Sequence, residues 1–184
     1  MESGQRTLRV GRTRVRLGRG KAFGSGEHET TRSCLHVLEH LAPAEGAAVL
    51  DVGCGTGILG IAALKLGARS VVAFDTDPDA LETTRVNAGL NGVSGQMTLF
   101  LGEVHALRNV RFDLILANLY GDLLLASMRS LASLLIPGGH FLMSGIRWED
   151  RFELETSVGR QGLSIRKVFM LPEYVTVLAR AGRD

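Results

Sequence analysis

A short apolar run that leads into alternating glycines limits the fold of this 184-residue chain more than any other feature. Residues 47–52 (AAVLDV) lack the alternation of apolar and polar side chains that marks a strand with one face in water. Such a run is typical of a strand in a parallel sheet covered by helices on both faces. Gly53, Gly55 and Gly57 follow it and allow a sharp turn into a helix. A tight turn needs only one or two glycines, so the third indicates that a ligand approaches the backbone and the free N–H groups of the helix N-terminus.

Helices and strands are expected to alternate along the rest of the chain. Short apolar runs indicate further strands at residues 70–74, 96–101, 112–117, 140–144, 164–170 and 174–179. Helices are expected at residues 29–41, from the glycines to about residue 66, and at residues 78–90, 122–135 and 148–161. Pro43 should end the first helix, and Pro137-Gly138-Gly139 should form a turn before the next strand.

This alternation predicts a doubly wound α/β fold with a seven-stranded, mostly parallel sheet. The last two expected strands, residues 164–170 and 174–179, have no helix between them. They should therefore form an antiparallel C-terminal hairpin at one edge of the sheet.

The N-terminus differs from the rest of the chain in charge. We expect a basic arm at residues 1–20 and a single domain at residues 21–184. Between Gln5 and Lys21 there is no acidic residue, and seven residues are basic: Arg6, Arg9, Arg12, Arg14, Arg16, Arg19 and Lys21. The simpler interpretation is the solvated face of a β-hairpin that turns at Gly11-Arg12, with Leu8, Val10, Val15 and Leu17 facing inward. The alternative is an arm that contacts RNA or another acidic partner.

Composition excludes several other classes of protein. The chain has no apolar run of about 18 or more residues and no apolar core of a secretory signal near its start. Its two cysteines, Cys34 and Cys54, do not make a disulfide framework and do not stand at metal-ligand spacing. We therefore expect a cytoplasmic protein without a membrane segment or a metal site.

Polar side chains stand at or just after the ends of several expected strands. Asp51 and Asp75 lie at two strand ends, and Glu103 and Asn118 follow two others. Ligands of doubly wound folds bind outside the carboxyl ends of the strands, so these four side chains are candidate ligand contacts. Other interpretations stay open, because Glu103 could be a solvated loop carboxylate and Asn118 could merely close its strand. Tyr120 is either pocket wall or core.

Two cofactors fit a glycine-rich turn with an acidic residue at the next strand end. Gly55, Gly57 and Gly60 match the spacing of nicotinamide dinucleotide enzymes, with Asp75 placed for a ribose. Asp51, however, would repel a pyrophosphate. S-adenosylmethionine has no phosphate, so Asp51 could help to hold its amino-acid end while Asp75 accepts hydrogen bonds from both ribose hydroxyls. S-adenosylmethionine is therefore the favoured cofactor.

Several segments resemble class I S-adenosylmethionine-dependent methyltransferases: residues 49–68 (VLDVGCGTGILGIAALKLGA), 74–78 (FDTDP), 116–124 (LANLYGDLL) and 136–139 (IPGG). Residues 22–31 (AFGSGEHETT) are similar to a more specific run, AFG-small-G-x-H-x-TT, of the bacterial ribosomal protein L11 methyltransferases. The resemblance covers roughly residues 21–180. It implies the Rossmann-like class I methyltransferase fold and S-adenosylmethionine as the methyl donor.

The resemblance also implies roles for single residues. The family positions that contact the cofactor correspond to Thr31, Gly53, Asp75 and Asn118, while Phe23 and Gly24 would border the methyl-transfer site. Together with the strand-end residues, the expected cofactor contacts are Phe23, Gly24, Thr31, Asp51, Gly53, Gly55, Gly57, Asp75, Thr76, Glu103 and Asn118.

The family trimethylates amino groups, lysine side chains and an N-terminal amine, of one ribosomal protein, so a protein substrate is implied here. The catalytic candidates are Asn118, Phe23 and His28. The amide of Asn118 is neutral and can hold a neutral amine. His28 could be a helper base or a substrate contact, or an exposed loop residue between Glu27 and Glu29.

The family normally carries a separate N-terminal domain that grips the ribosomal protein, and only about twenty residues precede residues 22–31 here. Either the chain belongs to a longer protein, or it is a relative with another substrate. A methyltransferase for a small molecule or a nucleic acid stays open, although Asn118-Leu119-Tyr120 lacks the Asn-Pro-Pro-aromatic run of many base methyltransferases. A nicotinamide-dependent oxidoreductase and a non-catalytic cofactor-binding module are the remaining alternatives.

Overall fold

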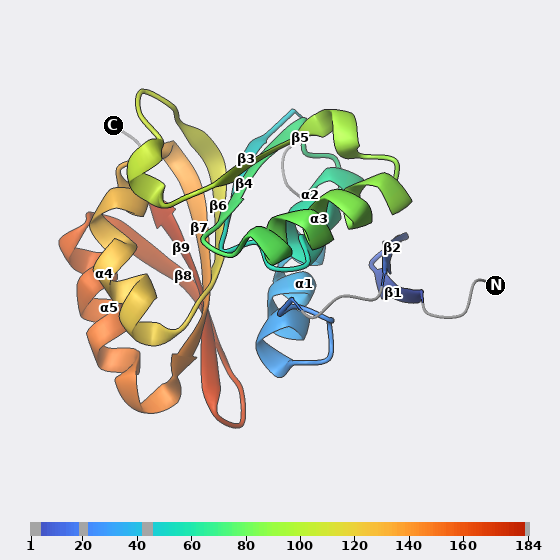
Figure 1. Ribbon diagram of the computed structural model, residues 1–184. Coiled ribbons are helices and arrows are strands. Elements are labelled where there is room, and N and C mark those ends of the chain that lie inside the picture. Colours follow the sequence, from blue (N-terminus) through green and yellow to red (C-terminus); the bar gives the residue numbers. More distant parts are fainter. Residues whose placement is uncertain (1–4, 19–21, 42–45, 183–184) are drawn as a thin grey trace.

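The computed structural model describes residues 5–18, 22–41 and 46–182, and a seven-stranded sheet forms its centre (Figure 1). The strands of this sheet are β3 (Ala48–Val52), β4 (Ser70–Asp75), β5 (Met97–Leu101), β6 (Phe112–Asn118), β7 (Leu135–Arg147), β8 (Leu163–Met170) and β9 (Tyr174–Ala181). Their order is β5-β4-β3-β6-β7-β9-β8. The first five in this order are parallel, and β9 is antiparallel to both of its neighbours. The predicted mixed sheet with an antiparallel C-terminal hairpin is confirmed.

The α-helices of the described residues are α1 (Glu29–Leu41), α2 (Ile58–Lys65), α3 (Pro78–Leu90), α4 (Gly121–Ala132) and α5 (Arg151–Arg160). Short 3-10 helices also occur: η1 (Ser94–Gln96), η2 (Val104–Ala106) and η3 (Trp148–Asp150). The helices predicted at residues 29–41 and 78–90 have those bounds, whereas the last predicted helix is divided between η3 and α5. Pro43 lies outside the described residues. No helix of the described ranges is both long and apolar enough to cross a membrane.

The strand after α4 differs from its prediction. We expected a helix to residue 135 and a strand only from residue 140, but α4 ends at Ala132 and β7 already begins at Leu135. The pairing with β6 shifts between Phe112↔Leu135 and Leu114↔His140, so the Pro-Gly-Gly run forms an irregularity within the strand instead of a turn before it. Pro lacks an N–H for the ladder and is tolerated at such an irregularity.

Helices cover both faces of the sheet, with α1, α2 and α3 on one side and α4 and α5 on the other (Figure 1). The buried strand β3 explains why both layers are needed. Its Val49 packs into the core under α1 and α2, whereas Leu50 and Val52 pack into the core under α4. The continuous apolar run at residues 47–52 is therefore a strand that is buried on both faces, as predicted.

The N-terminal segment forms a two-stranded hairpin of β1 (Arg6–Val10) and β2 (Thr13–Leu17), as predicted. Its apolar side chains face inward, because Val10, Val15 and Leu17 are buried and Leu8 packs against the same core. Polar bonds also fasten it to α3. The backbone N–H of Arg16 donates to Asn91 Oδ1 at 2.9 Å, and Asn91 Nδ2 donates back to the carbonyl of Arg16 at 2.7 Å. Whether residues 1–20 act as a unit separate from the domain stays a prediction.

The strand order reverses between β3 and β6. Successive crossovers build the sheet outward from β3 through β4 to β5 on one side, and from β6 to β7 on the other. The loops that follow β3 and β6 therefore diverge, which leaves a crevice at their carboxyl ends. The polar residues noted at the strand ends converge on this crevice.

Candidate active site

A cavity of about 730 Å³ opens at the carboxyl ends of the parallel strands. Eight predicted site residues line it: Phe23, His28, Gly53, Gly55, Asp75, Thr76, Glu103 and Asn118. Four other predicted residues are not part of its lining: Gly24, Thr31, Asp51 and Gly57. The topology thus gathers most of the candidates from distant parts of the sequence into one cavity.

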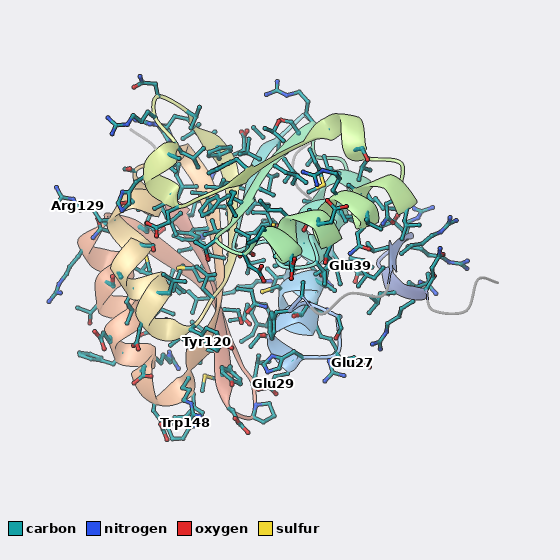
Figure 2. The ribbon with its side chains drawn as sticks, in the orientation of Figure 1. Glu27, Glu29, Glu39, Tyr120, Arg129 and Trp148 are labelled. Atoms are coloured by element: carbon teal, nitrogen blue, oxygen red, sulfur yellow. The ribbon has the colours of Figure 1, made fainter. Side chains whose placement is uncertain are left out.

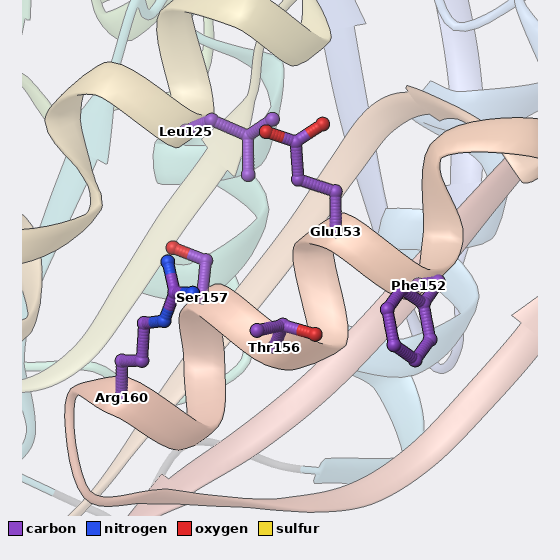
Figure 3. A pocket seen from close by; sticks show the side chains of 6 residues that line it. All are labelled: Leu125, Phe152, Glu153, Thr156, Ser157 and Arg160. Carbon is purple, nitrogen blue, oxygen red and sulfur yellow. The ribbon is translucent and has the colours of Figure 1, made fainter.

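A second hollow, of about 420 Å³, lies on the outer helical layer (Figure 3). It is lined by one residue of α4 and five of α5: Leu125, Phe152, Glu153, Thr156, Ser157 and Arg160. This hollow shares no lining residue with the larger cavity and includes none of the predicted site residues. The candidate active site is therefore the larger cavity.

The glycine turn after β3 is tied to its neighbours by close contacts that only glycine permits. Gly55 has φ +55°, and a Cβ at this position would lie 2.4 Å from the carbonyl oxygen of Phe23. A side chain here would clash with backbone, which cannot rotate away as a flexible side chain can. The backbone N–H of Gly55 also donates to Asp75 Oδ2 at 2.9 Å. The turn is therefore packed between the end of β4 and the segment that precedes α1.

Asp75, at the end of β4, organises two loops through its carboxylate. Its Oδ2 accepts the hydrogen bond from Gly55, and its Oδ1 accepts one from the backbone N–H of Asp77 at 3.1 Å. Each carboxylate oxygen has a second lone pair, so both can still accept a bond from a ligand hydroxyl. The N-cap of α3 is Asp77 and not Asp75, because Asp77 accepts from the backbone N–H of Asp79 at 2.9 Å.

The charge of the cavity is acidic. Asp75, Asp77 and Glu103 line it, and neither Lys nor Arg occurs among its described lining residues. Glu103 is exposed at the mouth, so a role as a solvated carboxylate stays open for it. Carboxylates attract a cationic ligand and repel a pyrophosphate. The acidic lining therefore disfavours a pyrophosphate, as the sequence analysis inferred from Asp51. Asp51 itself lies behind the cavity wall.

Residues 22–28, here called the Phe–Gly loop, are fastened to the glycine turn by Thr56. The backbone N–H of Thr56 donates to the carbonyl of Phe23 at 3.0 Å, and its buried hydroxyl donates to the carbonyl of Gly24 at 2.7 Å. The Thr56 carbonyl accepts from Asn87 Nδ2 at 2.8 Å, and Asn87 Oδ1 accepts from the backbone N–H of Gly18. Thr56 and Asn87 thus connect the cavity wall to the end of the N-terminal hairpin.

Aromatic rings form the wall of the cavity next to the Phe–Gly loop. The His28 ring lies 5.5 Å from the ring of Phe23 and 5.3 Å from that of Tyr174, between ring centroids. His28 Nδ1 is 2.8 Å from Thr30 Oγ1. His28 is partly buried among these partners, so it is not the freely exposed loop residue that one of our interpretations described.

Asn118 and Thr31 meet at the end of β6. Asn118 lines the cavity and donates from Nδ2 to Thr31 Oγ1 at 3.3 Å. Thr31 itself is buried, whereas its neighbour Thr30 lines the cavity. The hydroxyl of Thr31 therefore orients the Asn118 amide, and a direct cofactor contact by Thr31 stays a prediction.

Asp51 lies in the core behind the glycine turn. It is 2% exposed, and its Oδ2 accepts from the backbone N–H of Gly60 at 2.9 Å. Burial raises the pKa of this carboxyl to about 7, with a smaller upward contribution from the charge of Asp75, while the Gly60 bond lowers it. A contact to the amino-acid end of a cofactor would therefore run through the backbone or an ordered solvent molecule.

Sequence reasoning missed some of the lining. The cavity is also lined by residues that the sequence analysis did not predict, among them Thr30, His105, Leu123, Ala126, Ser127, Gly145 and Tyr174. Tyr174 begins β9, the second strand from the edge of the sheet, and approaches the cavity because β9 pairs with β7. Its sequence neighbours carry no motif, so nothing local could have pointed to it. For Tyr120 the sequence left two interpretations open, pocket wall or core. Tyr120 lines the cavity and projects into solvent at the start of α4 (Figure 2).

Comparison with known proteins resolves the family. The sequence model of the ribosomal protein L11 methyltransferase family matches residues 5–181. This chain belongs to that family. The match includes the N-terminal hairpin as well as the whole sheet, and the resemblance inferred from residues 22–31 is confirmed.

Individual relatives agree with the family match. A ribosomal protein L11 methyltransferase of Xanthomonas euvesicatoria is 44% identical over 135 residues, which is 72% of this chain and 44% of the relative. One from Geobacter sulfurreducens is 40% identical over 166 residues, or 90% of this chain and 54% of the relative. The chain therefore spans about half the length of the curated relatives that it matches.

Solved structures support the fold. A ribosomal protein L11 methylase from Lactobacillus delbrueckii superimposes with a TM-score of 0.83 at 32% identity, covering 91% of this chain and 84% of that one. A Thermus thermophilus 16S rRNA methyltransferase, determined with AdoMet and guanosine, has a TM-score of 0.79 at 23% identity, covering 97% of this chain and 51% of that one. The second likeness concerns the fold alone, which is that of the class I methyltransferases.

Proposed function

We propose that this chain binds S-adenosylmethionine and transfers its methyl group to an amino group of a ribosomal protein, either a lysine side chain or the N-terminal amine. The observation that carries the proposal is the acidic cavity at the switch point of a chain that belongs to the ribosomal protein L11 methyltransferase family. When bound, S-adenosylmethionine supplies a methyl group that its sulfonium already activates.

The residues of the cavity suit this cofactor. Gly53 and Gly55 present backbone to the cavity, and Asp75 has lone pairs left for two ribose hydroxyls. We assign Thr76 and Glu103, which also line the cavity, to the adenine. The three carboxylates of the lining would repel the pyrophosphate of a nicotinamide dinucleotide, which disfavours the oxidoreductase alternative.

The acceptor amine would enter beside the aromatic wall. Phe23, His28 and Tyr174 lie on that side of the cavity, and Asn118 also lines it. Holding the amine in line with the methyl group can lower the activation barrier by about 7–11 kcal/mol. A lysine must first lose its proton, against a solution pKa of about 10.4, and an apolar wall beside a sulfonium favours the neutral form. Asn118 can bind that neutral amine without protonating it, and we assign His28, which lines the cavity, as a helper base or a substrate contact.

The exposed face of the N-terminal hairpin is the proposed contact with a further partner. Arg9 and Arg14 are directly paired across the two strands and both are exposed, as is Arg16. Among the described residues no carboxylate forms an ion pair with any of these three; Arg6 pairs with Glu27. Like charges in register are unfavourable unless a partner neutralises them. We assign this face to RNA or an acidic protein, with an affinity that falls as salt rises.

Calorimetric titration with S-adenosylmethionine and, separately, with NAD tests the cofactor. We expect saturable binding of S-adenosylmethionine only; binding of NAD alone would overturn the proposal. Transfer of labelled methyl groups to purified ribosomal protein L11, and in parallel to a cell lysate resolved by mass, then tests the acceptor. Label on a different protein or on RNA would keep the cofactor and replace the substrate, and cofactor binding without any transfer would indicate a non-catalytic module.

A further inference from the structure

We propose that the outer face of α1 carries a binding site for a zinc-type divalent cation, formed by His36, Glu39 and His40. These positions are i, i+3 and i+4 of one helix, so they share a face. One ligand atom from each side chain lies within 4.8 Å of the other two. The site is independent of the proposed methyl transfer, because none of the three residues lines the cavity.

The helix leaves this face open. The buried residues of α1 point to the sheet, and they are Thr30, Thr31, Cys34, Leu35, Val37 and Leu38. His36, Glu39 and His40 are all exposed, and Figure 2 shows Glu39 on the side of α1 that faces the N-terminal hairpin. Both imidazoles are exposed, so a dissolved cation can reach their ring nitrogens.

The orientation of His40 favours metal binding. Its Nδ1 lies 2.8 Å from the backbone carbonyl oxygen of His36. A carbonyl oxygen can only accept, so Nδ1 carries the hydrogen and the neutral ring keeps a free lone pair on Nε2. A bond from the other ring nitrogen to a carbonyl is also what orients histidine ligands at protein metal sites. His40 is thus in the tautomer that a cation needs before any cation arrives.

Contacts with β8 and with the hairpin turn restrict the side chains of His36 and Glu39. The His36 ring packs edge-on against Phe169 of β8, with 6.3 Å between ring centroids, and lies 4.3 Å from the ring of His40. The side chain of Glu39 runs beside the hairpin turn, where a Cβ on Gly11 would lie 3.0 Å from Glu39 Cγ. These contacts remove side-chain freedom that a cation would otherwise have to restrict on binding.

The donor set selects the kind of metal. Two imidazole nitrogens and one carboxylate oxygen suit Zn²⁺, Cu²⁺ or Ni²⁺, whereas Mg²⁺ and Ca²⁺ prefer oxygen ligands alone. Three protein ligands leave one position of a tetrahedral zinc ion for water or for a side chain of a partner. The thiols of Cys34 and Cys54 are poor alternative ligands for the metal. Burial raises their pKa to about 12, and only a thiolate binds a metal ion well.

Calorimetric titration of the chain with ZnCl₂ tests the site. We expect one zinc ion per chain and a rise in the thermal midpoint, because a ligand that binds only the folded state stabilises it. Replacing both histidines in His36→Asn/His40→Asn should weaken binding by roughly tenfold or more, and Glu39→Gln by a smaller factor. The matched control is His140→Asn, which removes a histidine of β7 that belongs neither to this cluster nor to the cavity and should leave zinc binding unchanged.

His36, Glu39 and His40 are exposed and His140 is partly buried, so the variants should fold, and circular dichroism checks that they do. With Cu²⁺ as the probe, nitrogen coupling in the electron paramagnetic resonance spectrum should appear for the parent chain and vanish in the double variant. Zinc binding that is as tight in the double variant as in the parent would overturn the proposal. Absence of zinc binding up to about 1 mM in the parent would overturn it equally, since three preoriented ligands should bind zinc with a dissociation constant below that concentration.

Discussion

The two sides of the cavity are held in different ways. On the glycine side, formed by the turn at residues 53–57 together with Asp75, the contacts are backbone N–H groups bonded to a carboxylate. On the aromatic side, formed by the Phe–Gly loop and Tyr174, rings pack on rings and the loop is fastened from behind by Thr56. The glycine side tolerates no added atoms, whereas Phe23 on the aromatic side is 53% exposed.

This difference matches the two tasks that the proposed methyl transfer requires. A small cofactor with fixed chemistry is best held by rigid backbone at the ends of buried strands, where geometry is set by the sheet. A protein substrate must bring a flexible side chain from outside, and an exposed aromatic loop gives it an apolar path. Changes to the glycines or to Asp75 should therefore affect cofactor affinity, and changes that loosen the Phe–Gly loop should affect turnover.

The strongest test of the glycine side is Gly55→Ala. The new Cβ would lie 2.4 Å from the Phe23 carbonyl at a φ of +55°, so both the turn and the loop must shift. We expect S-adenosylmethionine affinity to fall by roughly 100-fold or more, which corresponds to about 3 kcal/mol. The matched control is Gly92→Ala, which has the same backbone strain at φ +70° but open space around its Cβ. Equal loss of affinity in both variants would show that strain alone is responsible.

An intermediate effect is expected for Asp75→Asn. The amide keeps the volume but removes the charge and one acceptor, while Gly55 and Asp77 both donate backbone bonds to this side chain. A hydrogen bond to a charged group contributes about 1.5–3 kcal/mol, so cofactor affinity should fall roughly 10- to 100-fold. The thermal midpoint should also fall by a few degrees, because one of the two backbone N–H groups loses its acceptor. Calorimetry measures both quantities. Unchanged affinity would remove Asp75 from the site.

The smallest effect, and the one that separates the two sides, is expected for Thr56→Val. The change removes the 2.7 Å bond from the buried hydroxyl to the carbonyl of Gly24, which costs about 1–3 kcal/mol locally. The Phe–Gly loop should then lose its fixed position, so kcat should fall by about tenfold while cofactor affinity changes little. Thr56→Ser keeps the hydroxyl and should restore kcat. A fall in cofactor affinity that matches the fall in kcat would contradict the division of tasks.

Much of the fold followed from local pattern. The strand at residues 47–52, the glycine turn and the strand ends marked by Asp75 and Asn118 are recognisable because a buried parallel strand needs a continuous apolar run and its end faces the crevice. The hairpin of the N-terminus was also predictable from the alternation of Leu8, Val10, Val15 and Leu17 with arginines. The start of β7 was not, because proline and glycine read locally as a turn, while pairing with β6 and β9 holds that segment in the sheet.

The sequence by itself determined the fold class, the family and the acidic, glycine-lined half of the cavity, because these depend on residues close together in the chain. Only the tertiary structure decided which candidates reach the cavity. It buried Asp51 and Thr31 behind the wall, brought Thr30 and Tyr174 into the lining, and tied the Phe–Gly loop to Thr56. These outcomes depend on strand order and on contacts between segments that are distant in sequence, and local pattern carries no information about such contacts.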